Sequence, residues 1–158
     1  MDDKKMRGFI PISIGMSKPE ASHNNVAHPS GWVKEFLAQK NIAVVGSFRS
    51  KEKVAYKIFL QLKEKGYNVF PVNPSLSDVE GVKCYPSISD ILYPIDAVDI
   101  VTPPEATEKI VEECKKKGIK YVWMQPGAES ENAIKFCEHN NIKVIHNSCL
   151  MVELGLNI

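Results

Sequence analysis

The chain has 158 residues, of which 44% are hydrophobic and 25% are charged, and its formal net charge is +1. This length and composition predict one soluble globular domain, and the small net charge excludes a global attraction to nucleic acid or anionic membranes. No apolar run approaches the roughly 20 residues that a membrane-spanning helix needs. The N-terminus also lacks the apolar core and cleavage site of a secretory signal. We therefore expect a cytoplasmic protein without nucleic-acid or membrane partners.

The first thirty residues are predicted to form a loosely ordered extension. They contain three prolines, a Ser/Asn/His cluster and little periodicity, with a short packed segment expected around residues 9–14. The next stretch, "GWVKEFLAQK" (residues 31–40), carries apolar side chains on one face of a helix, and Ser30 is its expected N-cap. We predict a single domain over residues 31–158.

From residue 41 onward, apolar segments alternate with amphipathic ones. Strands are predicted over residues 42–46, 68–72, 97–102, 121–125 and 143–147. Helices are predicted over residues 51–65, 104–117 and 129–139, where apolar side chains recur at helical spacing. In between, "KCYPS" (residues 83–87) indicates a short extra strand, and residues 87–92 indicate only one helical turn. The alternation predicts an α/β fold, a single Rossmann-like doubly wound domain with a mostly parallel five-stranded sheet.

The end of the first predicted strand has the features of a phosphate site. Gly46 ends the strand, and the turn after it reads Ser47, Phe48, Arg49, Ser50, Lys51 and, two residues further, Lys53. Such a junction offers backbone N–H groups, hydroxyls and a helix N-terminus to phosphate oxygens, and Gly46 is expected to leave room for them. The alternative is that the basic side chains only form the solvated face of a surface helix.

Two common nucleotide sites are disfavoured by the residues at the strand ends. A dinucleotide site has the pattern G-x-G-x-x-G and an acid after the second strand, whereas this turn has one glycine and "VNPS" (residues 72–75) follows the second strand. Pro74 stiffens this wall, and Asn73 offers amide contacts to an adenine or a ribose. The pattern G-x-x-x-x-G-K-[ST] of ATP-hydrolysing proteins is also missing.

Residues that could carry catalysis or bind a metal are sparse. His146 and Cys149 are three residues apart at the end of the last strand, but the sequence indicates no third group to orient them. The four cysteines are widely spaced, without a C-x-x-C motif, so we expect free thiols and no metal site. Gln125 ends the fourth strand and is expected to face the cleft. These patterns favour binding over catalysis, and we assign no catalytic residue.

Several motifs together resemble a known family. The stretches "VVGS", "PVNPSLSDVEGVKCYPSI", "DIVTPPE", "YVWMQPGAESENA" and "NSCLMVE" occur in order over residues 32–153. They are similar to those of the small stand-alone CoA-binding proteins, which look like the isolated CoA-binding Rossmann domain of the succinyl-CoA synthetase α-subunit. The resemblance implies coenzyme A (CoA) or an acyl-CoA as the ligand.

The resemblance also implies which residues surround CoA. Those against the phosphates are Gly46, Ser47, Phe48, Arg49 and Ser50. Those at the adenosine end are Val72, Asn73 and Pro74. Those lining the cleft or ending the next strand are Thr102, Pro103, Pro104 and Gln125, and those towards the pantetheine arm are Asn147 and Cys149. Leu76 stands where the synthetase domain has a lysine, so the 3′-phosphate is left to Arg49, Lys51 or Lys53.

The resemblance implies binding without turnover. Ligases of this type need one further domain for a phosphorylated histidine and another for the nucleotide, and we identify neither in this sequence. We therefore expect a non-catalytic carrier, sensor or regulator of acyl-CoA metabolism, with a protein partner left unidentified. Two alternatives stay open: a Rossmann regulator that binds an NAD-type nucleotide, and a small CoA-dependent enzyme that uses Cys149 or His146.

Overall fold

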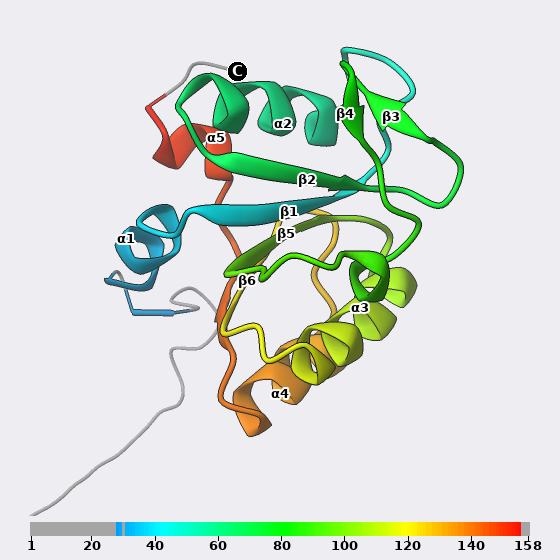
Figure 1. Ribbon diagram of the computed structural model, residues 1–158. Helices are drawn as coiled ribbons and strands as arrows, with labels where there is room; N and C mark the ends of the chain where they lie inside the picture. Colours follow the sequence, from blue (N-terminus) through cyan, green and yellow to red (C-terminus); the bar gives the residue numbers. More distant parts are fainter. Residues whose placement is uncertain (1–27, 30, 156–158) are drawn as a thin grey trace, which may run out of the picture.

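A parallel sheet forms the centre of the protein (Figure 1). The computed structural model describes residues 28–29 and 31–155, so residues 1–27 and Ser30 of the predicted extension over residues 1–30 lie outside the described residues. The strands of the sheet are β1 (Asn41–Gly46), β2 (Asn68–Val72), β5 (Ala97–Val101), β6 (Tyr121–Met124) and β7 (Lys143–Ile145). Their spatial order is β2-β1-β5-β6-β7, and neighbouring strands all run parallel. The predicted doubly wound, Rossmann-like α/β fold is confirmed.

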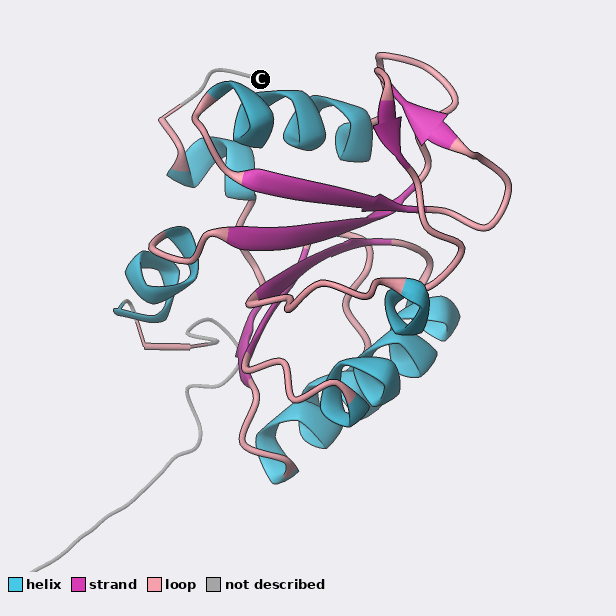
Figure 2. Cartoon of the chain, viewed as in Figure 1, coloured by secondary structure: helices cyan, strands magenta, loops and turns pink. Residues whose placement is uncertain are grey.

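Helices cover both faces of the sheet (Figure 2). One face packs against α1 (Gly31–Leu37), α2 (Val54–Glu64) and α5 (Leu150–Glu153), and the other against α3 (Pro104–Lys116) and α4 (Glu131–His139). Because helices bury both faces, a strand such as β1 is apolar along nearly its whole length, which is the usual pattern of a parallel sheet. Among the described residues, no helix has the length and apolar character required to cross a membrane.

Two helices differ from the prediction in ways that concern the site, while most other elements differ at their ends by one to three residues. Helix α2 begins at Val54 rather than at residue 51, and Lys53 has an extended backbone at the N-cap position. The first buried residue of α2 is Ala55, so the polar residues before it have no packing to hold them in a helix. Helix α5 was not predicted, because four residues are too few to show a helical period.

The segment between β2 and β5 forms a small hairpin instead of one extra strand. The strands β3 (Asp78–Val79) and β4 (Val82–Lys83) pair antiparallel. The turn residues Glu80 and Gly81 both have positive φ angles, 52° and 78°, as a tight two-residue hairpin turn requires. The predicted helical turn is present as the 3₁₀ helix η2 (Ile88–Asp90).

Candidate functional site

The carboxyl ends of the central strands meet where the strand order reverses. Gly46 at the end of β1 pairs with Val101 of β5, while β2 pairs with β1 on the other side. In open α/β sheets, ligands bind in the crevice outside such a reversal. A cleft of about 340 Å³ lies next to this reversal, between the ends of β5 and β6, and it is lined by Val101, Thr102, Pro103, Pro126, Gly127 and Ala128. Of the three residues predicted to line the ligand cleft, Thr102 and Pro103 are among the residues lining this hollow and Pro104 is not.

Gly46 is a packing residue. A Cβ atom placed on Gly46 would lie 2.8 Å from the Cβ of Ala55 on α2 and 2.8 Å from the carbonyl oxygen of Val101. Real Cβ atoms do not approach other atoms so closely, so glycine allows α2 to lie directly against β1. The space that we expected Gly46 to leave for a phosphate is therefore filled by the protein itself on this side.

The turn after Gly46 has both buried and exposed side chains. Phe48 is buried and packs edge-on against Phe59 of α2, with ring centres 6.1 Å apart, so its side chain belongs to the core. The hydroxyl oxygen of Ser47 is buried and has no hydrogen-bond partner among the described residues. The three basic side chains of the turn are exposed: Arg49, Lys51 and Lys53. Because the side chain of Phe48 is in the core, only its main chain is left to face a ligand.

The start of α2 is open to an anion. Lys53 provides no side-chain cap, and the first turn of α2 contains no acidic residue. The N–H groups of a helix's first turn have no partners within the helix and carry partial positive charge. Of the exposed charged side chains just before the helix, Arg49, Lys51 and Lys53 are basic and Glu52 is acidic, so their net formal charge is positive. Phosphate binding at this turn stays a prediction.

Asn73 holds the ends of β1 and β2 together. Its Nδ2 donates to the carbonyl oxygen of Gly46 at 2.7 Å, and its Oδ1 accepts from the backbone N–H of Ser75 at 2.8 Å. Both polar groups of the side chain therefore have protein partners, where we expected them to be available to an adenine or a ribose. Val72 is buried and Pro74 is exposed at the same strand end.

The start of α3 forms the next wall of the edge. Pro103 is the N-cap residue and Pro104 occupies the first turn, where a missing N–H costs no helical hydrogen bond. The hydroxyls of Thr102 and Thr107 lie 2.9 Å apart, and Thr107 also donates to the carbonyl oxygen of Pro103 at 3.3 Å. These bonds fix the Thr-Pro-Pro turn against the cleft.

Gln125 does not face the cleft, and this expectation was wrong. Only 1% of its surface is exposed, because it points into the layer between the sheet and α5. There Nε2 donates to Oδ1 of Asp99 at 2.5 Å, and Oε1 accepts the backbone N–H of Leu150 at 3.1 Å. Sequence reasoning missed Asp99, although an acid in the middle of the apolar strand "AVDIV" was a visible signal. Burial raises the pKa of the Asp99 carboxyl to about 7, against the lowering effect of the Gln125 hydrogen bond.

His146 and Cys149 follow β7 at the same edge of the sheet. Burial lowers the pKa of His146, and its ring lies edge-on to that of His28 with centres 6.1 Å apart. Cys149 is half-buried, whereas the other three cysteines are buried, and all four are free. No hydrogen bond joins His146 to Cys149 in the described part of the chain, so the two do not form a nucleophile–base pair in this state. Within residues 28–29 and 31–155, no three His, Cys, Asp or Glu side chains are grouped as metal ligands.

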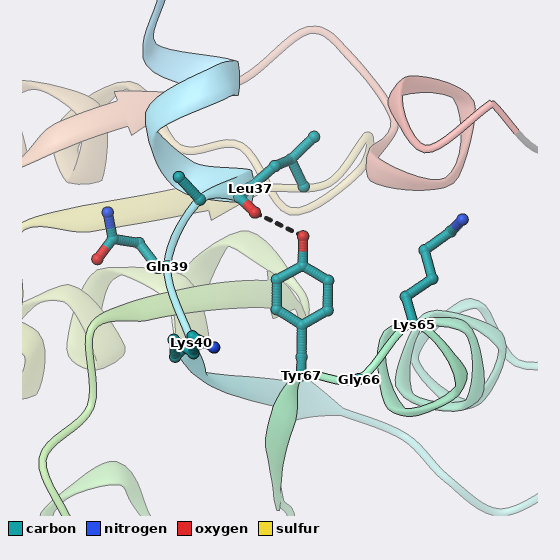
Figure 3. A pocket seen from close by; sticks show the side chains of 7 residues that line it. Leu37, Gln39, Lys40, Lys65, Gly66 and Tyr67 are labelled. Atoms are coloured by element: carbon teal, nitrogen blue, oxygen red, sulfur yellow. Dashed lines mark hydrogen bonds between the residues drawn. The ribbon is translucent and has the colours of Figure 1, made fainter.

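A second, larger hollow of about 470 Å³ lies at the opposite, amino-terminal edge of the sheet (Figure 3). Its wall is formed where α1 and α2 end, and the Tyr67 hydroxyl donates to the carbonyl oxygen of Leu37 at 2.5 Å. Lys40 and Lys65 lie at this rim, where positive side chains balance the partial negative charge of helix C-termini. This hollow is separate from the edge where the predicted residues gather.

Comparison with known proteins identifies the family. Residues 40–155 match the CoA binding domain. The chain belongs to this CoA-binding domain family. It is 36% identical over 119 residues to an ADP-forming acetate–CoA ligase of Methanocaldococcus jannaschii, covering 70% of this chain but only 17% of that ligase. It thus spans about a sixth of the length of that relative.

Smaller relatives match over most of their length. The uncharacterized protein YneT of Bacillus subtilis is 30% identical over 121 residues, which is 76% of this chain and 90% of that protein. A hypothetical protein of known structure from Pyrococcus horikoshii is 38% identical, with a TM-score of 0.75, and the match covers 78% of this chain and 87% of that chain. The predicted resemblance to stand-alone CoA-binding proteins, and to the CoA-binding domain of synthetase-type ligases, is confirmed.

Proposed function

We propose that the protein binds CoA or acyl-CoA at the carboxyl edge of its sheet. The observation that carries this proposal is the uncapped N-terminus of α2, which lies beside the strand-order reversal and next to exposed Arg49, Lys51 and Lys53. Phosphate groups are favoured at such helix ends by both N–H donors and the helix dipole. Membership of the CoA-binding domain family supplies the chemical identity of the ligand.

The ligand lies across three strand ends in this proposal. Its phosphates contact the main chain of residues 47–50, and its adenosine end lies against Val72 and Pro74. The Thr102–Pro103–Pro104 turn forms the wall of the cleft, and the pantetheine arm runs towards Asn147 and Cys149. Gln125 and Asn73 act behind this surface, because their polar side-chain groups already bond the protein.

We propose that binding occurs without chemical turnover, as in a carrier, sensor or regulator in the cytoplasm. In the described part of the chain, His146 and Cys149 share no hydrogen bond. This supports the proposal, because a cysteine nucleophile needs a base within hydrogen-bond reach. The matched relatives that are ligases are several times longer than this chain, so their reaction involves sequence that this chain does not align with. A small enzyme that uses Cys149 is the alternative, and it predicts release of free CoA from acetyl-CoA.

Isothermal titration with CoA, dephospho-CoA, acetyl-CoA and NAD, side by side, tests the proposal. We expect saturable binding of CoA and acetyl-CoA, weaker binding of dephospho-CoA, and no comparable binding of NAD. Thiol detection during the acetyl-CoA titration checks turnover in the same samples. Tighter binding of NAD than of CoA would overturn the proposal in favour of an NAD-type regulator.

A further inference from the structure

A chain of buried polar groups connects the centre of the sheet to the start of α5. Asp99 on β5 is fully buried, and its Oδ1 accepts from Nε2 of Gln125 at 2.5 Å. Gln125, in turn, accepts the backbone N–H of Leu150 at 3.1 Å. Burying a carboxyl and an amide is costly unless they are hydrogen-bonded, so their place in an otherwise apolar layer calls for a role.

The chemistry of the three groups allows only one arrangement of the amide. The Leu150 N–H can only donate, so it requires Oε1 of Gln125. Asp99 Oδ1 accepts, so it holds Nε2 of Gln125 on its own side and leaves Oε1 for Leu150. A side chain at position 99 that offers no acceptor would leave Nε2 of Gln125 without a partner in the buried layer and so weaken this arrangement.

The segment that these bonds hold contains Cys149. Trp123 Nε1 donates to the carbonyl oxygen of Ser148 at 2.9 Å, and Gln125 holds the N–H of Leu150, so Cys149 lies between two adjacent anchors. Helix α5 has four residues, and the Cys149 side chain makes no capping bond to it. So short a helix is not stable by itself, and its position depends on what holds its first residue.

We propose that Asp99 and Gln125 are positioning residues that hold Cys149 in its half-buried place at the carboxyl edge of the sheet. They touch neither the ligand nor the reacting atoms in this proposal and act through the main chain of Leu150. Their relevance to CoA rests on the proposed function, because the pantetheine arm is what would run towards Cys149. Their effect on Cys149 itself does not depend on any ligand.

The test measures the alkylation rate of Cys149 by iodoacetamide under native conditions, with peptide mapping by mass spectrometry. The other three cysteines are buried, so Cys149 is the expected site of fast labelling. Gln125→Met keeps a similar volume and removes both hydrogen bonds, and Asp99→Leu removes the orienting acceptor. Losing a buried hydrogen bond corresponds to about a tenfold change in a local opening equilibrium, so we expect labelling of Cys149 to become about tenfold faster.

Two further variants separate positioning from general loss of stability. Asp99→Asn keeps an acceptor at Oδ1 and should label within about threefold of the wild-type rate. Val98 lies on the same strand as Asp99 and is equally buried, but its side chain faces the α3–α4 layer. Val98→Ala should therefore lower stability and leave Cys149 labelling unchanged. Wild-type labelling rates in Gln125→Met and Asp99→Leu, or equal acceleration in Val98→Ala, would overturn the proposal.

A measurement on the wild type covers the case in which a variant does not fold. Hydrogen exchange of the Leu150 amide should be as slow as that of the amides in β6, because Gln125 holds it in the buried layer. Exchange at the rate of an exposed loop would overturn the proposal without any substitution. Labelling repeated with saturating CoA tests the ligand separately: absence of protection at Cys149 would contradict the proposed path of the pantetheine arm and leave the positioning role standing.

Discussion

Replacing Asp99 with asparagine should remove a pH dependence of stability that this single carboxyl group causes. Burial raises the pKa of the Asp99 carboxyl from 3.8 to about 7 in the folded protein. Between these values the folded state holds a proton that the unfolded state has lost, so the free energy of unfolding falls as pH rises. The penalty is absent below about pH 4 and complete above about pH 7. At about 1.4 kcal/mol for each pKa unit, it amounts to about 4 kcal/mol.

Urea unfolding between pH 4.5 and 8.5, followed by tryptophan fluorescence, measures this effect. Trp123 is a suitable probe, because it is fully buried and pairs with Asp99 in the register of β5 and β6. The asparagine side chain at position 99 is uncharged at every pH, so the stability of the Asp99→Asn variant should fall less steeply with pH than that of the wild type. The absolute stability of the variant also includes the cost of an unpaired amide N–H. The quantity to compare is therefore the slope of the free energy of unfolding against pH, not the stability at one pH.

Glu112→Gln is the matched control for the loss of one carboxylate. Glu112 is exposed on α3, so its substitution should leave the slope unchanged within error. Equal slopes in the wild type and in Asp99→Asn would refute the reasoning, because the buried carboxyl would then titrate as it does in the unfolded chain.

Three further predictions concern the site. Gly46→Ala should lower the free energy of unfolding by about 2 kcal/mol or more, because the new Cβ meets the backbone of β5. Gly31→Ala is the control, because a Cβ at Gly31 points into open space. Urea unfolding measures both variants, and equal stabilities would contradict the prediction. Replacing Arg49, Lys51 and Lys53 together by alanine should weaken CoA binding by about tenfold to a hundredfold, since each exposed contact is worth about 0.5–1 kcal/mol. Dephospho-CoA binding should weaken less; titration showing equal losses would mean that these side chains do not recognise the 3′-phosphate. Mild oxidation with CoA should form a mixed disulfide at Cys149, and peptide mapping that finds CoA at Cys84 or Cys114 instead would contradict the proposed path of the pantetheine arm.

The sequence alone was sufficient to predict the layered α/β fold and the edge of the sheet where the candidate residues gather. Hydrophobic periodicity is a local property, and the segments from residue 41 to residue 139 are long enough to show it. Predicting the strands also locates the candidate residues, because ligand-facing turns in a parallel sheet come after the carboxyl end of each strand. Gly46 was singled out for the same reason, as the one glycine in the turn that follows the first strand.

The tertiary structure decided what the individual side chains do. Phe48 packs into the core, Gln125 turns away from the cleft, and Gly46 makes room for α2 rather than for a phosphate. Each of these outcomes depends on a contact with a residue far away in the sequence, such as Asp99 for Gln125, and periodicity contains no information about such partners. The start of α5 is bonded to Gln125 and Trp123, which are about 25 residues away in the sequence, and a four-residue segment shows no period from which it could be predicted.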